Sequence, residues 1–104
     1  MHYDEILAHR AQPCTLRFMS AQVEDEPALA GSLAEVSSRR EQGEFEQFSL
    51  LFRRSESGAA RQGTYAVTFA DDTTWEVFLV PIRREGADTV YEACFNRKVP
   101  VAAA

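Results

Sequence analysis

The sequence predicts a small, mainly β domain, namely an antiparallel six-stranded barrel or sandwich with one short N-terminal helix. Its 104 residues fit a single domain, because domains usually contain about 100–200 residues. Several segments alternate apolar and polar residues with a period of two, which is typical of strands. Six strands in a chain of this length bury their apolar faces only by closing on themselves or by folding into two layers.

The second half of the chain contains three strand patterns joined by short polar segments. Residues 63–69 read G-T-Y-A-V-T-F, and residues 74–82 and 90–96 show a similar alternation. Asp71-Asp72 supplies turn chemistry between the first two strands, because aspartate side chains bond to their own backbone. Residues 83–88 are polar and contain a glycine, so we expect a hairpin loop there. The three segments therefore predict an antiparallel meander.

The segment 74–82 has apolar side chains on both of its faces. One face carries Trp75, Val77 and Leu79. The other face carries Phe78, Val80 and Ile82. This arrangement predicts a strand that is covered on each side. Pro81 has no amide hydrogen to donate, so it should mark the end of the strand, an edge position or a bulge.

The first half of the chain predicts a helix and two further strands. Residues 4–11 fit two helical turns, and residues 14–19 and 45–53 alternate as strands do. Residues 55–60 form a plausible loop from the second of these strands to the meander. We expect much of the core to consist of aromatic side chains from the strands: Phe48, Phe52, Tyr65, Phe69, Trp75 and Phe95.

Residues 28–38 fit either a helix or a strand. Leu29, Leu33 and Val36 have helical spacing, and the acids and proline of 24–27 resemble a helix start. Strand packing can override such a local preference, because helix propensity is a weak prior. Over the whole chain we expect one β domain at residues 1–98 and a flexible tail at 99–104.

The charge balance argues against two classes of partner. Eleven basic and sixteen acidic residues give a net charge of -5. Binding to nucleic acid and docking on anionic lipid both draw on a basic surface, so neither partner is expected. No apolar stretch is long enough for a signal peptide or a membrane span, so we expect a cytoplasmic protein.

No arrangement of reactive side chains predicts catalysis, a cofactor or a metal site. Cys14 and Cys94 lie in apolar runs, which predicts two buried reduced thiols, with a disulfide between them as the alternative. The imidazoles are His2 and His9, in the predicted helix or just before it, where a solvated helix face is expected. An enzyme is therefore the least favoured class of protein.

Three pairs of arginines lie at strand ends or loops: Arg39-Arg40, Arg53-Arg54 and Arg83-Arg84. We expect each pair to be solvated separately; the alternative is a shared patch for an anionic partner, provided that the fold brings the pairs to one end. Gln47 and Glu92 are candidate polar residues of a ligand pocket, provided that their strand faces close over a cavity. The alternative for Glu92 is an outward-facing side chain on a solvated strand.

Three short motifs occur in a fixed order along the C-terminal part of the chain. They are Q-G-T-Y at 62–65, F-L-V-P-I at 78–82 and Y-E-A-C-F-N at 91–96, preceded by an aromatic strand at 48–52. Together they resemble a family of short uncharacterised bacterial proteins, a domain of unknown function.

This resemblance implies a strand around 30–37, followed by a turn at 41–43, and it supplies no catalytic residues. It also implies an association with genes for phage-tail-like collar or fibre proteins. We therefore expect a non-catalytic structural or protein-interaction module, accessory to a larger bacterial or phage-tail-like assembly, whose partner is another protein or a second copy. A β-barrel that binds a small molecule is the alternative, because closed β domains often hold a cavity at one mouth.

Overall fold

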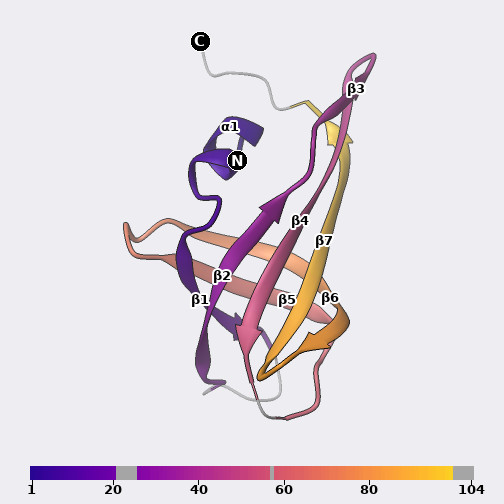
Figure 1. Cartoon of the computed structure of the whole chain (residues 1–104). Helices are drawn as coiled ribbons and strands as arrows, with labels where there is room; N and C mark the ends of the chain where they lie inside the picture. Colours follow the sequence, from indigo (N-terminus) through magenta and orange to yellow (C-terminus); the bar gives the residue numbers. More distant parts are fainter. Residues whose placement is uncertain (21–25, 57, 100–104) are drawn as a thin grey trace.

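The structure is a computed structural model that describes residues 1–20, 26–56 and 58–99. These residues form one helix and seven strands (Figure 1). In chain order the elements are α1 (Tyr3–Ala8), β1 (Pro13–Phe18), β2 (Ala28–Val36), β3 (Arg40–Gln42), β4 (Phe45–Ser55), β5 (Gly63–Phe69), β6 (Thr74–Glu85) and β7 (Asp88–Lys98). Among the described residues, no helix is long and apolar enough to cross a membrane.

Six of the strands close into an antiparallel barrel. Their order is β2-β1-β5-β6-β7-β4, and the barrel closes because β2 also pairs with β4. In Figure 1, β2, β4 and β7 run lengthwise while β5 and β6 cross behind them. The short strand β3 pairs with β4 alone and extends the sheet beyond the closed part. The predicted six-stranded barrel is therefore confirmed, and β3 is an addition to it.

The closing pair brings two backbones unusually close together at Gly31. A Cβ atom at this position would lie 2.0 Å from the carbonyl oxygen of Arg53 and 2.6 Å from Cδ1 of Leu16. Real Cβ atoms do not approach other atoms so closely, so only glycine lets β2 reach β4 here. Gly31 pairs with Cys14 of β1 on one side and with Arg54 of β4 on the other.

The interior of the barrel is filled with apolar side chains. The largest fully buried ones are Tyr65, Tyr91, Phe52, Phe69, Ile6, Leu16, Leu33, Leu50, Leu79 and Val67. Of the six aromatic residues expected in the core, all but Phe95 are buried, and Phe95 is half-buried with its ring stacked 4.8 Å from that of Phe48. Burial of this apolar surface is the main force that stabilises the fold.

A buried glutamate lies beneath the N-terminal segment, at one end of the barrel. Glu46 is 1% exposed, and its two carboxylate oxygens bind Arg39 at 3.3 Å and Arg97 at 3.3 Å. Arg97 also donates to the carbonyl of Met1 at 2.7 Å, and the hydroxyl of Tyr3 donates to the carbonyl of Ser37 at 2.7 Å. These bonds fasten the start of the chain and α1 over this end.

A second buried ion pair includes Arg54, from the inner face of β4. Its guanidinium binds the carboxylate of Glu56 at 2.7 Å and the carbonyl of Leu16 at 3.2 Å, and both side chains of the pair are about 5% exposed or less. The hydroxyl of Tyr91 donates to the same carboxylate, and Tyr65 lies within 3.3 Å of that hydroxyl. Burial, and then the bond to Glu56, raise the pKa of Tyr91, so its hydroxyl stays protonated and donates.

Several elements confirm or correct the sequence prediction. Residues 28–36 form a strand, as the family resemblance implied. A register shift between Pro81 and Arg83 shows that, of the strand end, edge position and bulge expected for Pro81, the bulge is the one that occurs. The hairpin expected at 83–88 is confirmed, but its loop is shorter than predicted. Strands β6 and β7 continue to Glu85 and Asp88, and Gly86-Ala87 alone connect them, with Gly86 at φ +62°, which favours glycine.

The expected covering of both faces of residues 74–82 is also wrong. The inner face of β6 is buried, but on its outer face Phe78 is 54% exposed and Ile82 is 42% exposed. In a closed barrel no second layer covers the outside of the wall, which explains the difference. The tail predicted at 99–104 lies outside the described residues except for Val99, whose amide donates to the carbonyl of Glu44 at 2.8 Å.

The buried ion pair gives a direct test of how the barrel is stabilised. Glu56→Gln leaves the Arg54 guanidinium buried without its carboxylate, so we expect the free energy of unfolding to fall by about 3 kcal/mol. Denaturant unfolding measures this change. Glu44→Gln, the same substitution in the exposed pair with Lys98, should cost under about 1 kcal/mol. Equal losses in the two variants would contradict the assigned role of the buried pair.

Candidate functional site

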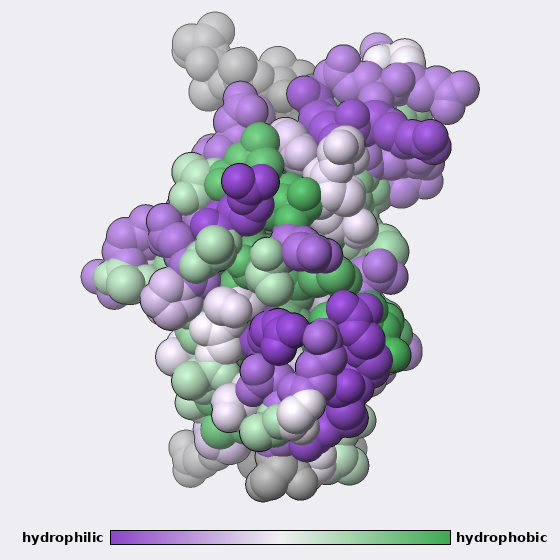
Figure 2. Space-filling model, in the orientation of Figure 1, coloured by the Kyte–Doolittle hydropathy of each residue, from purple (hydrophilic) through white to green (hydrophobic). Residues whose placement is uncertain are grey.

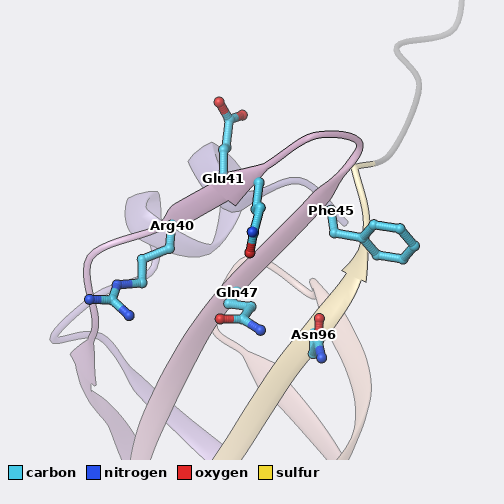
Figure 3. A pocket seen from close by; sticks show the side chains of 6 residues that line it. Arg40, Glu41, Phe45, Gln47 and Asn96 are labelled. Carbon is cyan, nitrogen blue, oxygen red and sulfur yellow. The ribbon is translucent and has the colours of Figure 1, made fainter.

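A projecting ribbon of three strands carries one polar outer face. Residues that are paired across neighbouring strands point to the same side of the sheet. Five side chains share this face through the pairs Arg40–Gln47, Gln42–Phe45 and Gln47–Asn96. We call it the ribbon face: Arg40, Gln42, Phe45, Gln47 and Asn96. They line a groove of about 730 Å³. In Figure 3, Gln47 and Asn96 lie side by side and the Phe45 ring projects from the same ribbon.

The ribbon face combines an exposed aromatic ring with uncommitted polar groups. Phe45 is 53% exposed. Gln42, Gln47 and Asn96 are exposed as well, and their amides make no hydrogen bond within the part of the chain that the structure describes. Glu41 also borders the groove, but its side chain points away from Gln47 and Asn96 (Figure 3).

A second feature is an apolar row on the outside of β6, the β6 outer row, formed by Phe78, Val80 and Ile82. Phe78 is paired with Thr64 of β5, and the amide of Met19 bonds the Thr64 carbonyl at 2.9 Å. Met19, at 37% exposed, therefore extends the apolar surface across β5. Hydrophilic side chains gather instead over the β3–β4 hairpin and at the far end of the molecule (Figure 2).

The two residues predicted for a ligand pocket both lie on the outside of the barrel. Gln47 belongs to the ribbon face, whereas Glu92 borders another groove with Arg10 and Glu35. Gln47 pairs with Asn96, and Glu92 pairs with Leu51. The two residues are thus four positions apart along the ladder, roughly 13 Å, and the fold does not bring them into one site.

The other members of the ribbon face were not predicted as a site, and the turn expected at 41–43 is wrong, because residues 40–42 form β3 and the turn follows at 43–44. Arg40 and Gln42 belong to a strand of three exposed residues, which has no apolar alternation to reveal it. Phe45 and Asn96 were expected only as strand ends, without a surface role. The hairpin Gln42-Gly43-Glu44-Phe45 is the one feature that could have indicated a strand on its N-terminal side.

The expectation that His9 lies on a solvated helix face is wrong, because its side chain packs against the barrel. Its ring lies 4.5 Å from the ring of Phe69 and 5.2 Å from that of Trp75. Nδ1 is 2.8 Å from the carbonyl oxygen of Glu5, and Nε2 is 3.0 Å from a carboxylate oxygen of Asp71. Both nitrogens face acceptors, so the geometry suits the doubly protonated ring.

The same contacts shift the pKa values of both partners. The bond to the Glu5 carbonyl, together with Asp71, raises the pKa of His9 above 6.5. Bonds from Thr73, and then the one from His9, lower the pKa of Asp71 from 3.8 to about 2. The contribution of His9 to stability is therefore complete below pH 6.5 and is lost as the pH rises through its folded pKa. The contribution of Asp71 is present above pH 3.8 and is lost as the pH falls toward 2.

We expect Asp71→Asn to lower the melting temperature most between pH 3.8 and 6.5, where both charges are present. The difference from the unsubstituted protein should shrink above the folded pKa of His9, because the imidazole is then neutral. Melting curves across the pH range measure it. Asp72→Asn is the matched control in the same turn, and a difference that is the same at every pH would refute the ion pair.

The two cysteines occupy different environments and are not paired. Both are free thiols; Cys14 is buried, and Cys94 is exposed on the outer face of β7, so the expectation that both are buried is wrong for Cys94. Burial raises the pKa of Cys14 to about 11. The pKa of Cys94 is also raised, through desolvation and then the neighbouring Glu92. Neither thiol is activated as a nucleophile.

Thiol labelling should separate the two cysteines. We expect a thiol reagent to modify Cys94 in the native protein and to reach Cys14 only after unfolding. Mass spectrometry of native and denatured samples counts the labels. Native labelling of Cys14 at the rate of Cys94 would show that β1 is not held in the closed sheet.

The expectation that the arginine pairs are solvated separately is wrong for two of the three pairs, while Arg39-Arg40 lies apart from the others. Arg53 and Arg83 share the carboxylate of Glu85, while Arg54 and Arg84 both contact Glu56, so two of the pairs meet at one end of the barrel. At this end of the barrel, carboxylates compensate the charges of Arg53, Arg54 and Arg83. Among the described residues, no three His, Cys, Asp or Glu side chains are grouped so as to hold a metal ion.

These features define a small closed antiparallel barrel with an N-terminal helix over one end and its polar groove on the outside. Residues 3–95 match the model of a domain of unknown function, DUF6916, and the chain belongs to this family. The match spans the helix and nearly all of the barrel, and it confirms that the chain belongs to an uncharacterised domain family. Comparison with curated proteins and with solved structures gave no match.

Proposed function

We propose that the protein is a non-catalytic protein-interaction module, accessory to a larger bacterial or phage-tail-like assembly, which docks through the β6 outer row. The observation that supports this most is the exposure of Phe78 and Ile82 on a strand whose sequence is apolar on both faces. Contiguous exposed apolar side chains are typical of surfaces that another protein covers.

The composition of this surface fits a protein interface. Interface cores are enriched in aromatic side chains and methionine and depleted of charge. Phe78 and Met19 are of these types, and the Thr64 between them is uncharged. A large aromatic side chain that a partner fully buries can carry much of the binding energy, with the neighbouring contacts excluding water.

The interior offers less support for the small-molecule alternative. Tyr65, Tyr91 and Phe52 fill the middle of the barrel, and the grooves described above lie on its outside. Catalysis has little support either, because the titratable groups with shifted pKa values are dispersed. Tyr91 is inside the barrel, Asp71 is in the β5–β6 turn, and each shift has a local structural cause.

Site-specific photo-crosslinking in the native cell tests the proposal. Benzoylphenylalanine in place of Phe78 should give a protein adduct, which mass spectrometry identifies as another protein or as a second copy of the chain. The same reporter in place of Phe45 is a matched control, since the two phenylalanines are equally exposed, at 54% and 53%.

A second substitution checks that the adduct depends on the apolar row. Adding Ile82→Arg to the Phe78 reporter should abolish the adduct, because it places a charge within the surface that the partner would cover. Adducts at 78 that match those at 45, or that persist with Ile82→Arg, would contradict docking through the β6 outer row.

A further inference from the structure

The chemistry of the ribbon face is different from that of the β6 outer row. We infer that it is a binding site for a carbohydrate chain that carries carboxylate groups, such as a uronic-acid polymer. This inference does not depend on the proposed function, because it concerns other strands and another kind of ligand. It rests on three properties of the face: its free amides, its exposed ring and its uncompensated cation.

The amides match a ligand that is rich in hydroxyl groups. A primary amide offers two N–H donors and one carbonyl acceptor, and a hydroxyl likewise donates and accepts. Gln42, Gln47 and Asn96 bring three such groups onto one face, and none is engaged within the described residues. Neighbouring strands are about 4.8 Å apart, so the amides form a flat array that successive hydroxyls of a chain could contact.

Phe45 supplies the apolar part of the site. Its side chain is more than half exposed and stands beside the amides, on the same face as Gln47 two residues along β4. The flat C–H face of a sugar ring is weakly apolar and can cover an aromatic ring, which removes apolar surface from water. A face with amides alone would lack this contribution, and a face with apolar residues alone would lack specificity.

Arg40 indicates that the ligand carries negative charge. It is exposed at the margin of the groove, and the described residues place no carboxylate within ion-pair distance of it. Its neighbour Arg39, by contrast, binds both Glu41 and Glu46. A guanidinium is well shaped to bind a carboxylate through two parallel hydrogen bonds. In a protein of net charge -5, an uncompensated cation beside free amides favours an acidic sugar.

An acidic peptide is the competing ligand, and the geometry favours it less. A peptide that adds a strand to a sheet needs a free edge, and β3 supplies one. That edge is three residues long and bears Arg40 and Glu41, and short charged strands are the usual means of preventing such pairing. The free groups of the ribbon are side chains on its face, which suits a ligand that lies across the strands.

The side-chain amides can report binding directly, since their N–H groups give their own signals in nitrogen–proton correlation spectra. We expect a trigalacturonate probe to shift the signals of Gln42, Gln47 and Asn96, while those of Gln12 and Gln62 stay unchanged. Phe45→Ala should weaken binding about tenfold, equivalent to about 1.4 kcal/mol. Phe78→Ala is the matched control and should leave the affinity unchanged.

Two further probes decide the chemistry of the ligand. Cellotriose, a neutral chain of the same length, should bind more weakly, and Arg40→Gln should reduce the affinity for trigalacturonate to the same level. Triglutamate has the same charge without hydroxyls and should leave the amide signals unchanged.

Three results would overturn the inference. These are no shift of the three amides at millimolar trigalacturonate, equal shifts with triglutamate, and equal affinity for the neutral chain. Each leaves the crosslinking at position 78 unaffected, so failure here and failure of the proposed function are distinguishable.

Discussion

The pairing of β2 with β4 is the contact on which the rest of the structure depends. It turns a seven-stranded sheet into a closed six-stranded wall, and it is possible because Gly31 has no side chain where the backbone of Arg53 passes. Closure pairs the edge of β2 that an open sheet would leave free and leaves β3 as the end of the sheet. It also fixes which side of each strand faces inward, because a shift of one residue would exchange the two faces.

Closure has a second consequence, which concerns charge. Polar groups that closure buries need hydrogen-bond partners. The two buried carboxylates, Glu46 and Glu56, find theirs in arginine side chains. Such pairs add little net stability over apolar packing, but an unpaired partner would be costly. They therefore constrain the chain to one arrangement at each place. With the interior filled, the surfaces open to a ligand or partner lie outside, on the ribbon face and the β6 outer row.

The strands were predictable from the sequence where one face is apolar and the other polar. Residues 63–69 alternate cleanly, and the structure gives the same bounds for β5. The strand at β2 was not predictable from local pattern, because Leu29, Leu33 and Val36 also fit a helix; the pairing with two other strands decides it. Strand β3 has three exposed polar residues and no alternation of apolar and polar side chains, so its extended conformation follows from its pairing with β4.

The sites were less predictable than the fold for the same reason. A residue such as Cys94 or Phe78 lies in an apolar run, and the sequence does not state that the wall of a closed barrel leaves its outside bare. His9 was placed on a solvated helix because its partners, Asp71 and Trp75, are more than sixty positions away in the chain. The ribbon face likewise joins residues near 40, 45 and 96, which only the register brings together.

Amide hydrogen exchange tests barrel closure most directly. If β2 is held between β1 and β4, the amides of β2 that bond these neighbours should exchange as slowly as those in the middle of β7, since both belong to one cooperative unit. Fast exchange along β2, together with slow exchange in β4 and β7, would mean that the sheet is open at this seam and that the interior is not sealed.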